Sequence, residues 1–329
     1  MATTAGRPSR QARVPRPRAG RVTPSLVAGV LLLAMALVLL VSPSPPQARS
    51  DPRWQAFLPP SFGRILVGPH GGAVWQGVIP NRAAPLLHRP SLVYLPPRLD
   101  PGRRYPVLDL LHGMPGSPYS YVRGLRLATV ADDLIFRRAL RPLIIVMPVA
   151  GKDGRYDGEW TSGWEDFVVH DVVPWVDAHL PTIPLPRARI LAGMSAGGYG
   201  AADIALRHPA LFGTVESWSG YFHPLHDGSL AHATSMQLDA HDPSILLERV
   251  GGTLRRDGVR FFLSSGTTGD RRLAAQARLF AANLRRFHLR VQLLLRPGGH
   301  THRFWRAQLP SALRFAAPPQ PTLGGRSAP

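Results

Sequence analysis

The sequence of 329 residues contains no cysteine. Disulfides, thiolate nucleophiles and cysteine-ligated zinc are therefore excluded, and so is a lipid anchor attached to cysteine. Lysine is almost absent, since Lys152 is the only one, and 20 acidic residues stand against 39 Lys and Arg. The net charge of +19 comes from arginines spread along the chain, so we predict no binding to nucleic acid. Attraction to anionic lipid or cell-envelope polymer fits this pattern better.

The first sixty residues have the composition of a targeting or anchoring region. Residues 1–25 contain six arginines and no acid, which predicts a basic cytoplasmic tail. Residues 26–42 contain the apolar run LVAGVLLLAMALVLLV, which predicts a transmembrane anchor or a signal segment. Residues 43–60 predict a Pro-rich linker. We favour an uncleaved anchor at the cell membrane with the main domain outside the cytoplasm. Secretion after signal cleavage is the alternative.

Strand-like and helix-like segments alternate through residues 61–317. Eight runs predict strands: 72–79, 91–96, 105–113, 142–149, 188–195, 213–220, 259–266 and 289–297. Residues 165–180 and 269–288 predict helices, with Pro174 as a kink in the first. This order is typical of a mostly parallel central sheet with helices on both faces. Residues 318–329 are expected to be a disordered tail.

The stretch GMSAG, residues 193–197, lies where a predicted strand turns into a predicted helix. A G-x-S-x-G sequence at such a junction is typical of a nucleophile elbow, whose strained backbone projects the serine hydroxyl clear of the sheet. Gly193 and Gly197 would let the strand and the helix approach closely, which makes Ser195 the candidate nucleophile. The alternative is a tight packing turn with an incidental serine.

A serine nucleophile needs a base and an acid that orients the base. In this architecture they follow in the chain order Ser, acid, His. His300 follows the last predicted strand and two glycines and is the candidate base, while His302 is its rival. Asp270 follows the preceding strand and is the candidate acid, although an aspartate just before a helix can also be an N-cap. Asp239 and Asp242 are the alternative acids.

Backbone N–H groups are the candidates for an oxyanion hole. The N–H of Met114, in the loop after the strand at 105–113, would pair with the N–H of Ala196 at the start of a helix. A plain Gly/Pro turn is the alternative interpretation of that loop. Three aromatic residues are candidates for lining a substrate pocket, with simple packing as the alternative: Tyr156, Trp160 and Trp164.

The long segment 221–242 lacks a helical or strand period and is expected to cover the site as a loop. It contains four residues of metal-ligand type: His223, His226, Asp227 and His232. Their spacing fixes no ligand geometry. We therefore predict neither a metal nor any other cofactor.

Several stretches together resemble one family: VYLPPRLDPGRRYPVLDLLHGMPGS, WEDFVVHDVVPWVDAHLP, ILAGMSAGGYGAADIALRHPALFGTVESWSGYF, FFLSSGTTGD and PGGHTHRFW. They resemble the Putative esterase family of α/β-hydrolases, which includes esterase D-like enzymes, feruloyl and acetyl-xylan esterases, and the antigen 85 mycolyltransferases. The resemblance covers roughly residues 91–315 and implies an α/β-hydrolase fold. It also implies site residues: Ser195 as nucleophile, Asp270 as acid, His300 as base, and N–H groups near Met114 and Ala196 as oxyanion hole.

We therefore expect an extracytoplasmic serine hydrolase that cleaves carboxylic esters through an acyl-enzyme intermediate. An acyltransferase acting on a sugar or lipid hydroxyl is the alternative, and a non-catalytic module that binds envelope glycans is the second alternative. Substrates would be small-molecule, glycolipid or polysaccharide esters, and the N-terminal segment would contact the membrane. The sequence predicts neither the acyl and alcohol specificity nor the oligomeric state.

Overall fold

The structure is a computed structural model that describes residues 57–82, 89–151, 159–226 and 230–317. The chain divides into two units, residues 1–49 and 50–329, and every described residue belongs to the second. The predicted basic tail, membrane segment and C-terminal tail lie outside the described residues, as does most of the predicted linker. Within the described ranges, no helix combines the length and the apolar character that a membrane crossing requires.

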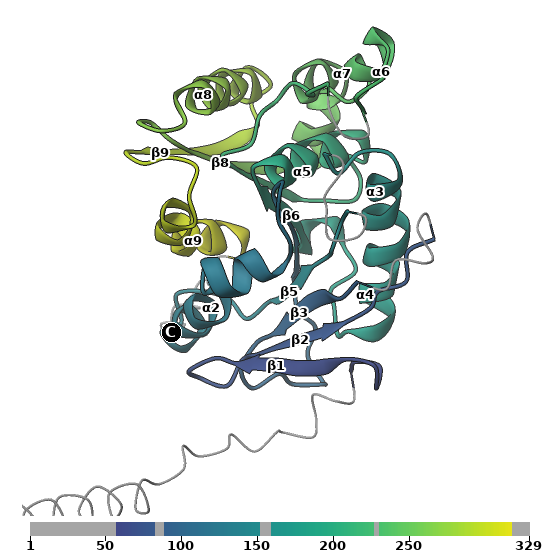
Figure 1. The fold of residues 1–329 in the computed structure, drawn as a ribbon, viewed down its shortest axis with the longest axis vertical. Coiled ribbons are helices and arrows are strands. Elements are labelled where there is room, and N and C mark those ends of the chain that lie inside the picture. Colours follow the sequence, from purple (N-terminus) through teal and green to yellow (C-terminus); the bar gives the residue numbers. More distant parts are fainter. Residues whose placement is uncertain (1–56, 83–88, 152–158, 227–229, 318–329) are drawn as a thin grey trace, which may run out of the picture. The chain divides into compact units, whose positions relative to one another are not determined.

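A nine-stranded sheet runs through the described part of the second unit (Figure 1). Its order is β1-β2-β3-β5-β4-β6-β7-β8-β9. The pairs β1–β2, β2–β3 and β3–β5 are antiparallel. The remaining pairs, which join β5, β4, β6, β7, β8 and β9 in this order, are parallel. The bounds are β1 Gly63–Val67, β2 Ala73–Gly77, β3 Ser91–Leu95, β4 Val107–Leu111, β5 Ile144–Met147, β6 Arg189–Met194, β7 Thr214–Trp218, β8 Arg260–Gly266 and β9 Arg290–Arg296. The predicted mostly parallel sheet is confirmed.

Helices cover both faces of the sheet (Figure 1). One face carries η2 (Ser120–Gly124), α2 (Leu127–Phe136) and α9 (His302–Ala316). The other carries α3 (Gly163–Asp166), η3 (Phe167–Val172), α4 (Val173–His179), α5 (Ala196–Arg207), α7 (Pro243–Arg256) and α8 (Arg271–Arg286). The short η4 (Pro186–Ala188) and α6 (Ser235–Asp239) lie in connections. Helices on both faces were predicted, and this too is confirmed.

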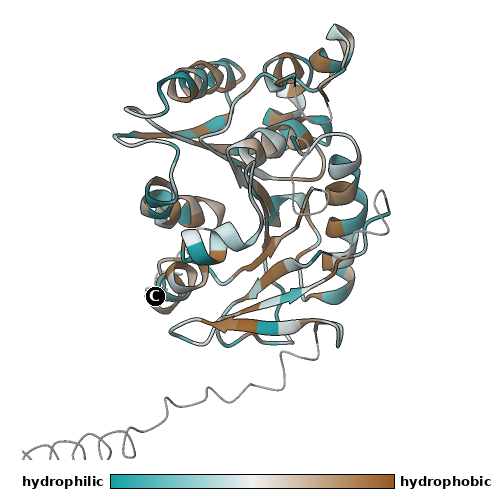
Figure 2. Cartoon of the chain, viewed as in Figure 1, coloured by the Kyte–Doolittle hydropathy of each residue, from teal (hydrophilic) through white to brown (hydrophobic). Residues whose placement is uncertain are grey.

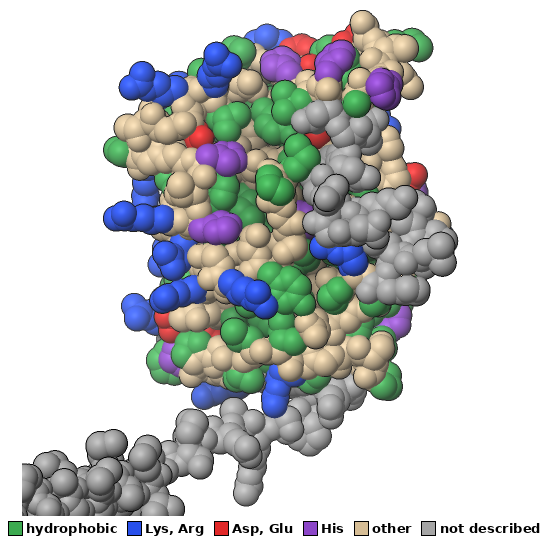
Figure 3. All heavy atoms as spheres, in the orientation of Figure 1, with side chains coloured by type: hydrophobic (Ala, Val, Ile, Leu, Met, Phe, Trp, Pro, Cys, Tyr) green, Lys and Arg blue, Asp and Glu red, His purple; other side chains and the backbone are tan. Residues whose placement is uncertain are grey.

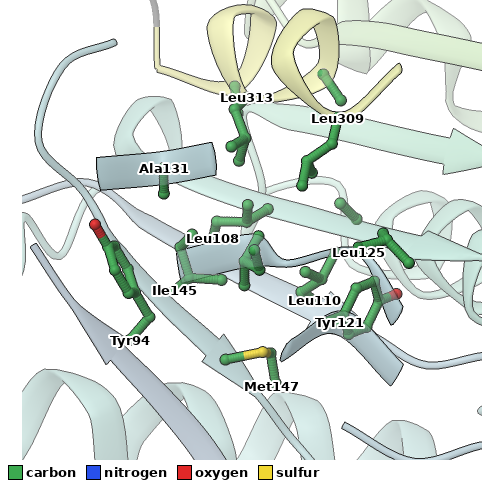
Figure 4. Close-up of a cluster of buried hydrophobic side chains, with 14 of the residues drawn as sticks. Tyr94, Leu108, Leu110, Tyr121, Leu125, Ala131, Ile145, Met147, Leu309 and Leu313 are labelled. Carbon is green, nitrogen blue, oxygen red and sulfur yellow. The ribbon is translucent and has the colours of Figure 1, made fainter. Parts of the chain in front are cut away.

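The central strands are buried on both faces, which accounts for their continuous apolar runs. In β4, Leu108 and Leu110 pack toward α2 and α9, whereas Leu111 packs toward α5. Figure 4 shows the first of these clusters, with Leu309 and Leu313 of α9 above the strands. In Figure 2 the strands are largely hydrophobic, while outer helices such as α8 carry residues of both kinds. Apolar burial from both sides therefore holds the central strands in place.

The predicted helix over residues 165–180 is present but changes form along its length. A π-helical stretch, η3, separates the short α3 from α4. Pro174 stands in the first turn of α4, directly after η3. Because proline has no N–H, one carbonyl of the preceding turn lacks its helical partner here. The helix changes from π to α form at this point, and the kink at Pro174 stays a prediction.

Candidate active site

Ser195 sits at the turn between β6 and α5. Its φ of 57° and ψ of −124° place a non-glycine residue in a rarely occupied backbone region. The Ser195 N–H donates to the Trp218 carbonyl at 2.8 Å, and the Ser195 carbonyl accepts from the N–H groups of Gly198 and Tyr199. The strained turn is thus held by hydrogen bonds to the neighbouring strand and to its own helix.

The glycines beside Ser195 allow a very close approach of three elements. A Cβ atom on Gly197 would lie 1.9 Å from the carbonyl oxygen of Leu111 in β4, and one on Gly193 would lie 2.3 Å from the backbone of Gly197. No side chain fits at either position. The close approach of strand and helix that the motif predicts is therefore confirmed.

The structure brings Ser195, Asp270 and His300 together. His300 Nε2 lies 2.8 Å from Ser195 Oγ, and His300 Nδ1 lies 3.2 Å from Asp270 Oδ2. The Asp270 side chain is buried, whereas 38% of the His300 side chain is exposed. Because β6, β8 and β9 are parallel, the residues that follow them meet at one edge of the sheet.

Two glycine-rich loops cross to bring the acid and the imidazole together. The N–H of Gly269 donates to the carbonyl of Gly298 at 2.8 Å. A Cβ atom on Gly269 would lie 2.7 Å from the Cα of Gly299, and Gly298 has a φ of +143°. The loop before Asp270 therefore passes the loop before His300 at backbone contact distance.

Of the two alternative acids, one has other partners and the other is exposed. Asp242 is the N-cap of α7, accepting from the N–H groups of Ser244 and Ile245, and its second oxygen lies 2.8 Å from His223 Nδ1. Asp239 is exposed in α6. Asp270 occupies the N-cap position of α8, but its side chain makes no capping hydrogen bond within the described chain. Its carboxylate faces His300 instead.

His300 contacts a further aromatic residue that the sequence analysis did not single out. The indole of Trp305 lies edge-on to the His300 ring, with ring centroids 4.8 Å apart, and its Nε1 donates to Ser219 Oγ at 3.2 Å. The exposed His302 lies on the same indole, at 5.9 Å between centroids. The rival histidine thus packs beside the site, and Trp305 holds one edge of the His300 ring.

The predicted oxyanion loop runs close to Ser195. A Cβ atom on Gly113 would lie 3.0 Å from the Ser195 Cβ, so the backbone leading to Met114 touches the serine. Ala196 is the first residue of α5, where N–H groups have no acceptor within the helix. Both N–H groups thus belong to backbone next to Ser195, and their role as an oxyanion hole stays a prediction.

A buried histidine holds the predicted oxyanion loop. His112 Nε2 accepts from the Ala150 N–H at 3.1 Å, which places the ring proton on Nδ1, 3.0 Å from the Gly113 carbonyl. Burial lowers the pKa of His112 to about 4, so the ring is neutral. In a trans-planar peptide the N–H points away from the carbonyl. Binding of the Gly113 carbonyl to His112 therefore turns the Met114 N–H away from that ring.

The predicted pocket aromatics lie in different surroundings. Trp160 is fully buried, and its Nε1 donates to the His112 carbonyl at 2.9 Å. Trp164 is partly exposed and lies edge-on to Phe167. Tyr156 lies outside the described residues. The pocket roles of all three stay predictions.

Glu165, Asp203 and His241 are the residues best placed to ligate a cation within the described ranges, since one ligand atom from each lies within 4.8 Å of the others. They already have partners, because Asp203 pairs with His241 and Glu165 accepts from Arg207 and His208. One ion pair between Arg207 and Glu165 and the hydrogen bonds of the two histidines account for the cluster. In the segment 221–242, for which we predicted no metal site, His223 pairs with Asp242. Asp227 lies outside the described residues.

Residues 88–316 match the family model described as "Putative esterase". The chain belongs to this family. The match confirms the predicted family.

Curated and solved proteins are similar to parts of this chain. The Mycobacterium tuberculosis protein named Esterase Rv1288 is 35% identical over 124 residues, which cover 36% of this chain and 26% of that relative. The chain thus spans about a quarter of that relative's length. A ferulic acid esterase structure superimposes with a TM-score of 0.66 at 23% identity, over 75% of this chain and 98% of its own. Mycobacterium tuberculosis MPT51 (FbpC1) gives 0.53 at 18% identity, over 72% and 95%. These structures share the α/β-hydrolase fold.

Proposed function

We propose that this protein cleaves carboxylic esters with Ser195 as nucleophile, through an acyl-Ser195 intermediate. The observation that carries the proposal is the hydrogen-bonded chain from Ser195 Oγ through the two nitrogens of His300 to Asp270. A hydroxyl becomes an effective nucleophile when a base takes its proton and a carboxylate holds that base in the right tautomer. The strained elbow and the family match support the same reading.

In the proposed acylation, Ser195 Oγ attacks the ester carbonyl carbon while its proton passes to His300 Nε2. Asp270 accepts from Nδ1–H and stabilises the imidazolium that forms. The N–H groups of Met114 and Ala196 donate to the carbonyl oxygen as it gains negative charge. The C–O bond of the ester then breaks, and the alcohol leaves with the proton from His300.

The acyl-Ser195 ester is then released to a second nucleophile activated by His300. Transfer to water gives hydrolysis, which we propose. Transfer to a sugar or lipid hydroxyl gives the acyltransferase alternative. The likeness of the fold to that of MPT51 is compatible with this alternative. A radiolabelled acyl ester incubated with and without added glucose separates the two, because only a transferase forms labelled acyl-glucose when glucose is present.

We also propose that the main domain acts outside the cytoplasm, attached to the membrane by residues 26–42. The support is the charge and hydropathy of the first 42 residues. The tethered protein is expected to stay with membranes after an alkaline carbonate wash and to be digested by protease added outside the cell. Release into the medium would favour the cleaved-signal alternative, and recovery in the cytosol would contradict both.

The deciding experiment is fluorophosphonate labelling combined with an ester panel. The wild type is expected to be labelled and to hydrolyse short-chain and aryl esters. Ser195→Ala should be unlabelled, with kcat lower by about 10⁴-fold or more. An unlabelled wild type that binds envelope glycans as well as Ser195→Ala does would instead favour the non-catalytic module. Amide analogues run in parallel test for peptidase activity.

A further inference from the structure

A cavity of about 380 Å³ lies at the amino ends of the parallel strands. Its walls include Pro106 directly before β4, Ile190 in β6 and Arg260 at the start of β8, together with Arg141 and Ala317. Backbone hydrogen bonds fix its rim, since the Arg141 N–H donates to the Ala317 carbonyl at 3.1 Å. The volume is that of a small-molecule site.

The charged side chains that line this cavity are all arginines. Arg141, Arg187 and Arg260 reach it, and no Asp or Glu lines it. Within the described residues, none of the three forms an ion pair with a carboxylate. Glu216 interacts electrostatically with Arg260, but burial raises the pKa of Glu216 to about 8. At pH 7 this acid is mostly protonated and supplies little compensating charge.

Arg260 is held in place by other contacts. It is partly buried, and its guanidinium donates from Nε to Thr214 Oγ1 at 3.0 Å and from Nη2 to the Ala316 carbonyl at 2.8 Å. Neither acceptor carries a full negative charge. A partly desolvated cation without a counter-charge is unfavourable, and an anion in the cavity relieves that cost.

We propose that this cavity binds an organic phosphate, that is, a phosphate mono- or diester. Guanidinium groups match the oxygens of phosphate with two parallel hydrogen bonds. The remaining lining is largely aliphatic and includes Ile183, Ala188 and Ile190. This surface contacts the carbon skeleton that the phosphate carries.

The proposed site is separate from the one around Ser195. Arg260 begins β8, which ends at Gly266 shortly before Asp270. At about 3.3 Å per residue, the strand separates the two sites by roughly 20 Å. The phosphate compound is therefore not the ester substrate at Ser195, and this inference does not depend on the proposed function.

Isothermal titration calorimetry of the full chain in non-ionic detergent tests the proposal. Glycerol 3-phosphate and dihexanoyl phosphatidic acid are the two probes, at about 0.15 M salt to screen long-range attraction. Saturable binding of one molecule per chain is expected. Arg141→Gln/Arg187→Gln should weaken it by about 100-fold, roughly tenfold for each guanidinium lost. Arg260 is left unchanged because it also holds the end of α9.

A matched variant separates a specific site from general attraction to a chain of charge +19. Arg272→Gln/Arg278→Gln removes two exposed arginines of α8 and should bind both probes like the wild type. Thermal unfolding checks that each variant is folded. Equal affinity for the probes supports a soluble phosphate ester, and tighter binding of the lipid supports an anionic headgroup. The absence of saturable binding, or an equal loss in both double variants, overturns the proposal.

Discussion

At the scale of single residues, Asp270 and Asp242 occupy the same position, directly before the first residue of a helix. Asp242 uses its carboxylate to cap α7, whereas the carboxylate of Asp270 lies against His300. The sequence around each residue is compatible with either role. The difference arises from the crossing glycine loops, which bring only Asp270 to the imidazole.

This contrast makes Asp270→Asn and Asp242→Asn a matched pair. Asp270→Asn should lower kcat by about 10³- to 10⁴-fold, because the amide no longer stabilises the His300 imidazolium or its tautomer. Asp242→Asn should leave kcat within a few-fold of the wild type, since asparagine still caps a helix. Steady-state kinetics on a fluorogenic ester decide the question. Similar losses of kcat in both variants, with folding intact, would count against Asp270 as the acid.

Individual contacts around the site were the hardest features to predict. The Gly-x-Ser-x-Gly motif and the chain order typical of this fold predicted Ser195 and His300 as partners, and the structure brings the two side chains together. Trp305 carries no such pattern, although it follows His300 closely in the chain. Its contact with the His300 ring exists only once α9 packs on the sheet. The neutral state of His112 could not be predicted from the sequence either, because it depends on complete burial in the folded protein.

At the scale of elements, β4, β6 and α5 are packed as closely as backbone allows. Gly197→Ala would place a methyl group against the Leu111 carbonyl and is expected to destabilise the fold by about 3 kcal/mol or more. Gly252 in α7 is the control, since a Cβ atom there meets only the end of Arg256 at 3.8 Å.

Chemical denaturation measures both effects. Gly252→Ala should stabilise the protein by about 0.5–1 kcal/mol, as expected for alanine in a helix. A Gly197→Ala variant with wild-type stability would show that strand and helix can separate without loss, which would contradict the close packing described above.

The strands that could be predicted from the sequence are mostly the buried ones. The eight predicted strands correspond to β2–β9, most of which are buried and apolar. β1 was missed because all five of its residues are exposed at the sheet edge, and its short sequence has no inward-facing period. The π-helical η3 was also missed, since a helical period of 3.6 residues describes an α-helix and a π turn almost equally well over six residues.

At the scale of the whole molecule, the surface is rich in positively charged side chains, whereas the interior contains acidic ones. Figure 3 shows arginine side chains scattered over one face, with few Asp and Glu between them. The interior contains acids instead, of which Asp109 in β4 is fully buried with no partner for either oxygen in the described chain. Burial raises the pKa of Asp109 to about 7, although Arg189 opposes the shift.

This shift makes stability depend on pH in a definite direction. Between pH 3.8 and about 7 the folded protein keeps the Asp109 proton that the unfolded chain releases, so rising pH favours unfolding. Asp109→Asn removes this dependence. Its stability relative to the wild type should therefore increase from pH 4 to pH 8 by an amount on the order of a few kcal/mol.

Thermal unfolding across that pH range measures the difference. Asp257→Asn changes an exposed aspartate at the end of α7 and should keep the pH slope of the wild type. A slope in Asp109→Asn equal to that of the wild type would mean that Asp109 is ionised in the folded protein. Glu216, whose pKa is also raised by burial, adds to this slope, whereas His112, whose pKa is lowered by burial, opposes it at acidic pH.

The chain order of the three residues has a consequence for biosynthesis. The ribosome makes Ser195 first and reaches His300 only 105 residues later. Under the proposed mechanism, a nascent or prematurely terminated polypeptide carries the hydroxyl without its proton acceptor. Esterolysis would therefore begin only after the last strand and its following loop have docked, which keeps the incomplete product inert toward cellular esters until synthesis has finished.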